Sequence, residues 1–206
     1  MTPPTLPHVV AFTGKAGSGK TTAANWILRN HPKAMKMSFA QPLKKMLYEL
    51  IRQSIPKAWP HTPIEYIDGA LKEEPIPFLS NRTGRELMQS LGTEWGRNTV
   101  QSDFWVNIAQ GKLERLLGDR RVASDTPQIL AVYDDMRFQN EADMIRSYGG
   151  LIVNVQRPLT KVTSDTTTNH SSEQQEIAPD LILQNDGTEE DFIAKVAELL
   201  PVPQKA

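Results

Sequence analysis

Cysteine is absent from the 206 residues of this chain. This absence excludes disulfide bonds, thiolate metal ligands and cysteine nucleophiles, and it fits a reducing compartment. Long hydrophobic runs are also absent, since no stretch approaches the roughly 18 apolar residues that cross a bilayer. Residues 1–7 hold three prolines and no basic cluster, so they do not read as a signal peptide. We therefore expect a cytoplasmic protein without a membrane partner.

A strong excess of charge of one sign is missing too. The 23 Lys and Arg residues nearly balance the 24 Asp and Glu residues, and the formal net charge is -1. No global positive field therefore points to nucleic acid as a partner. Hydrophobic residues make up 39% and charged residues 23% of the chain, as in ordinary globular proteins. The length suits a single compact domain over residues 1–206.

What the chain does contain is an alternation of strand-like and helix-like segments. Short apolar runs predict strands at residues 8–13, 34–40, 128–133, 151–156 and 181–183. Apolar residues at helical spacing predict helices at residues 19–30, 42–51, 64–71, 83–95, 103–117, 140–148 and 188–200. The remaining segments, including most of the proline-containing stretch 54–80 and the polar stretch 118–127, are expected to be irregular. This alternation indicates an α/β domain built around a mostly parallel sheet.

The strongest motif lies between the first predicted strand and the first predicted helix. Residues 14–21 read Gly-Lys-Ala-Gly-Ser-Gly-Lys-Thr and match the full phosphate-loop pattern G-x-x-x-x-G-K-[ST]. The glycines let backbone N–H groups approach phosphate oxygens, and the helix N-terminus adds a partial positive charge. Lys20 can reach the β- and γ-phosphates, and the Thr21 hydroxyl is placed to ligate Mg²⁺. A turn of this kind that binds nothing is the alternative, but all fixed positions and both flanks match.

We therefore expect a nucleoside triphosphate, with ATP as the first choice, at this loop. The expected contacts are Gly14, Lys15, Ala16, Gly17, Ser18, Gly19, Lys20, Thr21 and Thr22.

A carboxylate at the end of a neighbouring strand usually completes such a site by holding Mg²⁺. Asp134 and Asp135 directly follow the predicted strand 128–133, and the carboxyl ends of parallel strands are where ligands bind. Arg137 lies two residues beyond Asp135 and could meet a phosphate. A helix N-cap followed by a solvated arginine is the alternative interpretation of these residues.

The middle of the chain gathers residues suited to a second phosphate group. Arginine binds phosphate bidentately, tryptophan can stack on a base, and positions four apart share a helix face, as Arg85 and Gln89 do. The alternative is an amphipathic helix with a solvated, charged face. The cluster comprises Arg82, Arg85, Gln89, Glu94, Trp95, Arg97, Asp103, Phe104 and Trp105.

At this point the chain resembles the bacteriophage deoxynucleoside monophosphate kinases, a branch of the P-loop nucleoside monophosphate kinases. The resemblance spans residues 8–180. Its later motifs are individually short. Besides the loop at 14–21, it rests on residues 39–44, 87–94 with Arg97, 104–105, 135–138, 140–142, 157–158 and 170–173.

The resemblance implies a three-layer P-loop kinase fold with a five-stranded, mostly parallel sheet. It implies a helical monophosphate-binding region at about residues 42–118 and a lid at about 157–178. The implied reaction is transfer of the ATP γ-phosphate to a (deoxy)nucleoside monophosphate, in support of DNA synthesis. The implied location is the host cytoplasm if the gene comes from a phage, and a homodimer is one option for the assembly.

The resemblance also assigns roles to residues. Lys20, Asp135 and Arg137 would be catalytic, Thr21 and Asp135 would organise Mg²⁺, and Arg157 would contact ATP from the lid. Many monophosphate kinases carry several lid arginines, whereas here only Lys161 and His170 follow Arg157 as basic lid residues. The acceptor would be bound by Lys44, Arg85, Gln89, Trp95, Arg97, Trp105 and Arg137.

Two other functions share parts of this pattern. A kinase of another small phosphorylated acceptor, such as phosphomevalonate or dephospho-coenzyme A, would use the same loop and the same arginines. An NTP-hydrolysing switch or ATPase would use the loop alone. We rank the switch last because the sequence shows neither an Asn-Lys-x-Asp guanine-reading motif nor a strongly basic face.

Overall fold

The computed structural model describes residues 6–121, 128–158 and 177–202, without the side chains of 119–121. The chain divides into two compact units, of which the first comprises Met1–Phe39 and Ala109–Ala206 and the second Ala40–Ile108. The second unit thus interrupts the sequence of the first. The predicted acceptor-binding region, 42–118, overlaps most of it. Among the described residues, no helix is long and apolar enough to cross a membrane.

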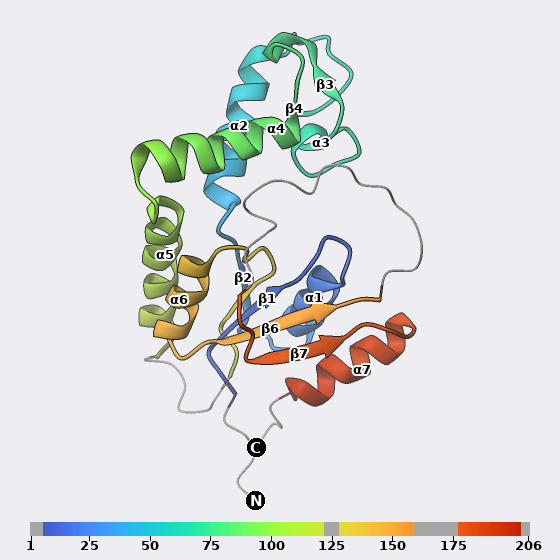
Figure 1. Ribbon diagram of the computed structural model, residues 1–206, viewed down its shortest axis with the longest axis vertical. Coiled ribbons are helices and arrows are strands. Elements are labelled where there is room, and N and C mark those ends of the chain that lie inside the picture. The colour runs from blue at the N-terminus through green and yellow to red at the C-terminus, as the bar shows by residue number, and fades with distance from the viewer. Residues whose placement is uncertain (1–5, 122–127, 159–176, 203–206) are drawn as a thin grey trace, which may run out of the picture. The chain divides into compact units, whose positions relative to one another are not determined.

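The first unit is built on a five-stranded sheet in the order β2-β5-β1-β6-β7 (Figure 1). All pairings in this sheet are parallel, with Val10 of β1 opposite Val132 of β5 and Leu151 of β6. The predicted five-stranded sheet is therefore confirmed, and it is wholly parallel. The strands are β1 (Val9–Thr13), β2 (Met35–Met37), β5 (Ala131–Tyr133), β6 (Leu151–Gln156) and β7 (Leu181–Gln184).

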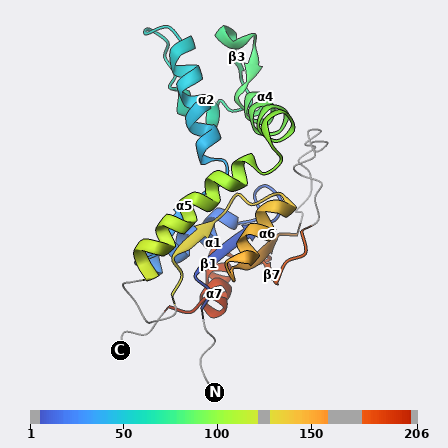
Figure 2. The same cartoon turned by 90° about the vertical axis from the view of Figure 1, so that its left-hand side faces the viewer.

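Helices cover both faces of this sheet, which gives the predicted three-layer architecture (Figures 1 and 2). On one face, α1 (Lys20–Asn30) and α7 (Glu189–Leu199) pack together on a core that includes Phe12, Ile27 and Phe192. On the other face, α6 (Gln139–Ser147) packs on β1 and β6. The last helix begins where predicted, because Thr188 caps it by accepting a hydrogen bond from the backbone N of Asp191 at 3.2 Å.

Helix α5 (Phe104–Arg121) starts in the second unit and continues into the first. Its Leu113 and Leu117 are buried, and Tyr148, which follows α6, donates a 2.6 Å hydrogen bond to Glu114 of α5. The sequence predicted an irregular stretch from residue 118 to 127. The helix runs further because its buried positions keep helical spacing to Leu117.

The second unit has its own core of Leu47, Ile51, Tyr66, Ile67 and Ile76. A short antiparallel hairpin within the stretch 54–80 and just beyond it was not predicted. It forms although each of its strands is only two residues long. The elements are α2 (Gln41–Ser54), α3 (Pro63–Ile67), β3 (Pro75–Ile76), η1 (Pro77–Leu79), β4 (Arg82–Thr83), α4 (Gly84–Gln89) and η2 (Ser90–Val100).

The segment η2 continues α4 as a π-helix to Val100, beyond the predicted end at residue 95. Trp105, buried at the start of α5, holds this segment by donating a hydrogen bond from Nε1 to the carbonyl oxygen of Gly92 at 2.8 Å. The indole also packs closely against Gly96, where an added Cβ would sit 2.4 Å from Nε1. Wide π-helical turns of this kind are rare and often occur at functional sites.

Candidate nucleotide-binding site

The phosphate loop follows β1 and ends in the first turn of α1, and its glycines have conformations that other residues rarely adopt. Gly14 has a φ of +131°, and a Cβ there would lie 2.3 Å from the carbonyl oxygen of Val155 on the neighbouring strand. Gly19 has a φ of +111°, and a Cβ there would lie 2.6 Å from Nδ2 of Asn185. Both positions therefore exclude any side chain, and the backbone can wrap around a ligand in the way that phosphate binding needs.

Lys20 folds back over this loop. Its Nζ donates hydrogen bonds of 2.7 Å to the carbonyl oxygens of Gly14 and Lys15. Burial lowers the pKa of the Lys20 ammonium from 10.5 to about 8; the charge of Arg137 acts in the same direction, and Asp134 opposes both. A phosphate bound in the loop would favour the charged ammonium, so the low pKa is a property of the loop without its ligand.

A buried hydroxyl inside the loop also points to an anion. Ser18 is only 3% exposed, and its Oγ has no hydrogen-bond partner among the residues that the structure describes. A buried hydroxyl without a partner is costly, so such a group usually has a ligand or a water. Gly14, Gly19, Ser18 and Lys20 together fit the phosphates of a nucleotide.

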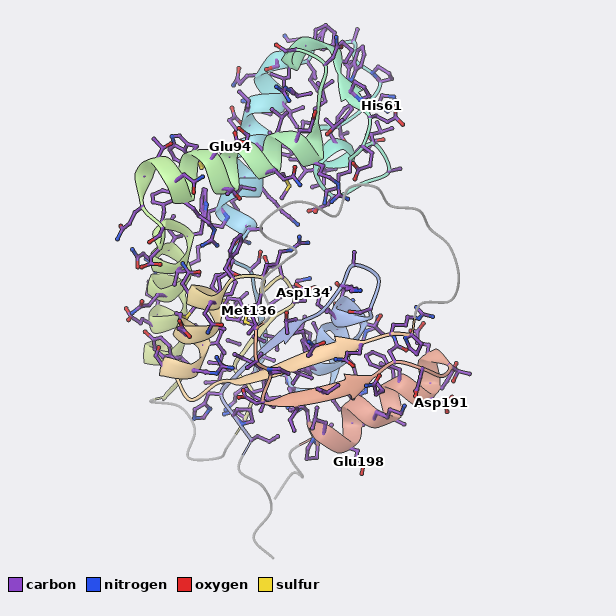
Figure 3. The ribbon with its side chains drawn as sticks, viewed as in Figure 1. His61, Glu94, Asp134, Met136, Asp191 and Glu198 are labelled. Atoms are coloured by element: carbon purple, nitrogen blue, oxygen red, sulfur yellow. The ribbon has the colours of Figure 1, made fainter. Side chains whose placement is uncertain are left out.

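The two aspartates after β5 lie in different environments. Asp134, labelled in Figure 3, accepts hydrogen bonds at Oδ2 from the Thr21 hydroxyl at 2.9 Å and from Lys36 Nζ at 2.8 Å. Asp135 accepts hydrogen bonds from the Ser38 hydroxyl at 2.6 Å and from the backbone N of Phe39 at 3.2 Å. The sequence paired Thr21 with Asp135, whereas the structure joins Thr21 to Asp134.

The oxygen donors beside the loop suit Mg²⁺. This ion prefers hard oxygen ligands and usually binds through one or two carboxylates, waters and substrate phosphates. The Thr21 hydroxyl and the Asp134 carboxylate, whose side chain is 9% exposed, form such a set. No cluster of three or more His, Cys, Asp or Glu residues that could hold a metal occurs in the described ranges.

Arg137 sits on a loop that α6 holds in place. The backbone N–H groups of Arg137 and Phe138 donate to Glu141 Oε2 at 2.7 and 3.1 Å. Glu141 is 3% exposed and lies in the first turn of α6, where the helix dipole favours a carboxylate. The arrangement fixes the backbone between Asp134 and α6, and the charge of Arg137 is felt at Lys20.

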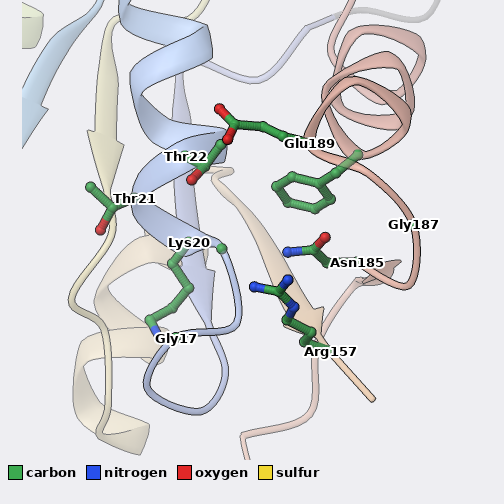
Figure 4. Close-up of a pocket in the computed structure, with 10 residues that line it drawn as sticks. Gly17, Lys20, Thr21, Thr22, Arg157, Asn185, Gly187 and Glu189 are labelled. Atoms are coloured by element: carbon green, nitrogen blue, oxygen red, sulfur yellow. The ribbon is translucent and has the colours of Figure 1, made fainter. Parts of the chain in front are cut away.

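A cavity of about 290 Å³ opens beside the loop (Figure 4). Its walls come from the start of α1, from Arg157 after β6 and from the turn between β7 and α7. Arg157 was predicted to contact ATP, whereas the turn was not predicted, although it follows the carboxyl end of a parallel strand, where ligands commonly bind. The lining residues are Gly17, Gly19, Lys20, Thr21, Thr22, Arg157, Asn185, Gly187, Glu189 and Phe192.

The predicted acceptor residues of the second unit are engaged in different ways. Lys44 Nζ pairs with Asp68 at 2.6 Å, and Arg85 Nε pairs with Glu73 at 2.6 Å. Arg97 donates to the carbonyl oxygen of Ser102 at 3.2 Å.

Trp95 is 39% exposed and packs edge-on against Phe104, whereas Trp105 is 3% exposed. Gln89 lies, half-buried, at the end of α4. The buried position of Trp105 gives it a packing role within the second unit and leaves little of it for a substrate. Of the predicted lid, 157–178, only the ends are described, and Lys161 and His170 lie outside the described residues.

The parallel sheet, the loop at its carboxyl edge and the Thr21–Asp134 pair define an α/β P-loop kinase. The family model described as deoxynucleotide monophosphate kinase matches residues 78–196. A protein of Acanthamoeba polyphaga mimivirus, provisionally named a deoxynucleotide monophosphate kinase, is 31% identical over 195 residues, which cover 91% of this chain and 93% of that protein. The chain belongs to the deoxynucleotide monophosphate kinase family and is a phosphotransferase.

Solved structures show a more distant likeness. A sugar kinase from Janibacter sp. aligns with a TM-score of 0.44 and 13% identity, covering 96% of this chain and 95% of that one. The tunicamycin resistance protein of Deinococcus radiodurans aligns with a TM-score of 0.43 and 12% identity, covering 97% and 99%.

Proposed function

We propose that this chain transfers the γ-phosphate of ATP to a deoxynucleoside monophosphate, which yields ADP and a deoxynucleoside diphosphate. The observation that carries the proposal is the complete phosphate loop, with Lys20 and the unpartnered Ser18 hydroxyl, in a chain of this family. An oxygen of the acceptor phosphate forms a bond to the γ-phosphorus as the bond to the β,γ-bridging oxygen breaks. The product supplies DNA synthesis, in the host cytoplasm if the gene is a phage gene.

The first unit provides the donor site. The loop from Gly14 to Thr22 holds the triphosphate, and Lys20 stabilises charge on the migrating group. The cavity beside Thr22 has room for the nucleoside, where the exposed guanidinium of Arg157 can lie against the base. Support for this placement comes from the continuity of the cavity from the loop to the β7–α7 turn.

Thr21 and Asp134 are the proposed Mg²⁺ ligands. When bound, the ion neutralises charge on the β- and γ-phosphate oxygens. Lys36 pairs with Asp134 in the structure at 2.8 Å and is 45% exposed, so it can move away from the carboxylate. Asp135, the ligand that the sequence indicated, is assigned instead to fixing the backbone at Phe39.

The acceptor residues are proposals that mutation has to test. The short ion pairs of Lys44 and Arg85 would have to exchange their carboxylate partners for a phosphate. Trp95 is the better candidate for stacking on a base, because it is more exposed than Trp105. The proposed set is Lys44, Arg85, Gln89, Trp95, Arg97 and Arg137.

The test is formation of ADP from ATP and Mg²⁺ with a panel of ribo- and deoxynucleoside monophosphates. We expect turnover with at least one deoxynucleoside monophosphate, and none with phosphomevalonate or dephospho-coenzyme A. The proposal would be refuted if no nucleotide gave a rate above that of the blank without acceptor. Turnover with one of the two other acceptors instead would identify a different kinase.

A further inference from the structure

The side chain of Asn185 connects the end of β7 to the phosphate loop. Its Nδ2 donates a 2.8 Å hydrogen bond to the carbonyl oxygen of Ser18, and its backbone N donates to the carbonyl oxygen of Gln156 at 2.7 Å. The residue is 8% exposed and lines the cavity beside the loop (Figure 4). This buried amide is therefore part of both the loop support and the nucleoside pocket.

The orientation of this amide is fixed by chemistry. A carbonyl oxygen such as that of Ser18 can only accept, so the NH₂ group of Asn185 has to face it. A flipped amide would set two oxygens against each other. Gly19 also packs closely on the amide, since a Cβ there would lie 2.6 Å from Nδ2. Asn185 cannot turn to suit its ligand.

The remaining polar atom of the side chain is Oδ1, which is an acceptor. Within the described ranges, the only side-chain hydrogen bond of Asn185 is the one from Nδ2, so no residue donates to Oδ1. An acceptor of fixed direction favours a base that presents an amino group and disfavours one that presents a carbonyl. Glu189, another acceptor in the lining, acts in the same sense. Arg157 brings donors, but no described residue holds its guanidinium by a hydrogen bond, so it can adapt to either kind of base.

We propose that Asn185 selects the base of the phosphate donor, accepting a hydrogen bond at Oδ1 from the 6-amino group of adenine. The inference rests on the proposed function, because it takes the cavity as the donor pocket. A site built to bond a ligand group rejects analogues that lack it, since the buried polar atom is left without a partner. The affinity should fall about 10-fold or more when the amino group is removed.

The test measures binding to the full chain by calorimetry, with Mg²⁺ and without acceptor. The ligands are ADP, IDP with a 6-carbonyl group, purine riboside diphosphate with hydrogen at position 6, and tripolyphosphate as a probe of the loop alone. We expect ADP to bind about 10-fold more tightly than either analogue.

Asn185→Ala should reduce the ratio of ADP to purine riboside diphosphate affinity several-fold, toward one. It should also weaken tripolyphosphate binding, because the carbonyl oxygen of Ser18 in the loop loses the hydrogen bond that Asn185 donates to it. A purely structural role would weaken all ligands equally and leave the ratio unchanged. Gln184→Ala is the matched control, because this exposed neighbour on β7 pairs with Gln156 and does not line the cavity.

Asn185→Ser, a smaller polar substitution, replaces Asn185→Ala if the latter fails to fold, with the same expectation. A wild-type ratio retained in the folded variant overturns the inference, as does equal binding of all three nucleotides by the wild type. If tripolyphosphate still binds when either of these results is obtained, the loop remains the donor phosphate site and only the role of Asn185 is refuted. Binding of neither tripolyphosphate nor any nucleotide overturns the proposed function and this inference together.

Discussion

Lys20 is the residue in the phosphate loop whose pKa is shifted furthest toward neutral pH. Burial lowers its pKa to about 8, and a bound triphosphate would restore the charged form. We therefore expect kcat/KM for ATP, which reports the free protein, to fall about tenfold per pH unit above about pH 8. The value of kcat should stay level there, because the phosphates raise the pKa in the complex.

The same shift has a defined sign for stability. The native ammonium loses its proton near pH 8, whereas the unfolded one keeps it to 10.5, so the unfolded state binds more protons in that window. This group therefore makes the protein more stable as the pH rises through the window.

Profiles of kcat/KM for ATP between about pH 6.5 and 9.5 test the predicted fall in rate. Lys20→Arg keeps its charge and should abolish the fall; a fall that persists in this variant would rule out Lys20 as its source.

Removal of the Lys20 charge should act on the chemical step. Lys20→Ala is expected to lower kcat by about 10²- to 10³-fold, because it removes stabilisation of the transferring group. Circular dichroism should remain close to wild type, because the hydrogen bonds of Lys20 in the described part of the chain go to its own loop. The melting temperature at pH 7 should not fall, because the substitution removes a desolvated ammonium. Turnover at the wild-type rate would contradict the assigned role.

Asp134 and Asp135 provide a matched pair of substitutions. Asp134→Asn should weaken Mg²⁺ binding in the presence of ADP about 10-fold or more, measured by calorimetry, with a small change in stability. Asp135→Asn should spare Mg²⁺ binding and cost about 1–3 kcal/mol of unfolding free energy, because it weakens the bonds to Ser38 and Phe39. If instead Asp135→Asn weakened Mg²⁺ binding and Asp134→Asn did not, Asp135 would be the metal ligand.

This pair also shows how far residue-level prediction reaches. The sequence places both aspartates at the carboxyl edge of the sheet, since they follow a buried strand. Which of them turns toward Thr21 depends on the backbone after Tyr133, and that path is set by contacts with residues 38–39 and with Glu141. Asn185 was missed for a similar reason, because its partner Ser18 lies 167 positions away in sequence.

At the scale of elements, substitution of two helical glycines by alanine should have opposite effects on the stability of the protein. An added Cβ at Gly84, the first residue of α4, would lie 1.7 Å from the backbone oxygen of Tyr66, whereas one at Gly111 in α5 meets nothing within 4 Å. Gly84→Ala should therefore destabilise the protein by more than about 2 kcal/mol. Gly111→Ala should stabilise it by about 0.5–1 kcal/mol, because alanine is the better helix former.

Chemical denaturation of both variants beside the wild type measures these changes. A stable Gly84→Ala protein would mean that α4 and Tyr66 are not packed as the structure has them. Equal destabilisation by both substitutions would instead point to a general intolerance of larger residues at these helices.

Elements whose apolar residues follow a strand or helix pattern were predicted well, and elements without such a pattern were not. The apolar runs at β1 and β6 and the spaced apolar residues of α1 and α2 determine strand and helix locally. The strands β3 and β4 have two residues each, too few for any period. The π-helix depends on Trp105 reaching Gly92, a contact made 13 positions away in sequence.

At the scale of the whole molecule, the two units should respond to different ligands. The described donor residues all lie in the first unit, in the loop, just after β6 and in the β7–α7 turn, whereas most of the proposed acceptor residues lie in the second. Ligand binding slows the local opening that permits amide hydrogen exchange. ADP should therefore protect amides of residues 14–22 and 185–189, and leave those of α4 and η2 unchanged.

A deoxynucleoside monophosphate should protect α4 and η2, and Arg85→Lys should remove most of that protection, because lysine cannot bind phosphate bidentately. Gly111→Ala is the control, since it changes stability without touching a proposed ligand contact. Hydrogen exchange with mass spectrometry reads both units in one experiment. Protection by the monophosphate confined to the first unit would remove the acceptor role from the second, while protection of residues 14–22 by ADP would still locate the donor loop.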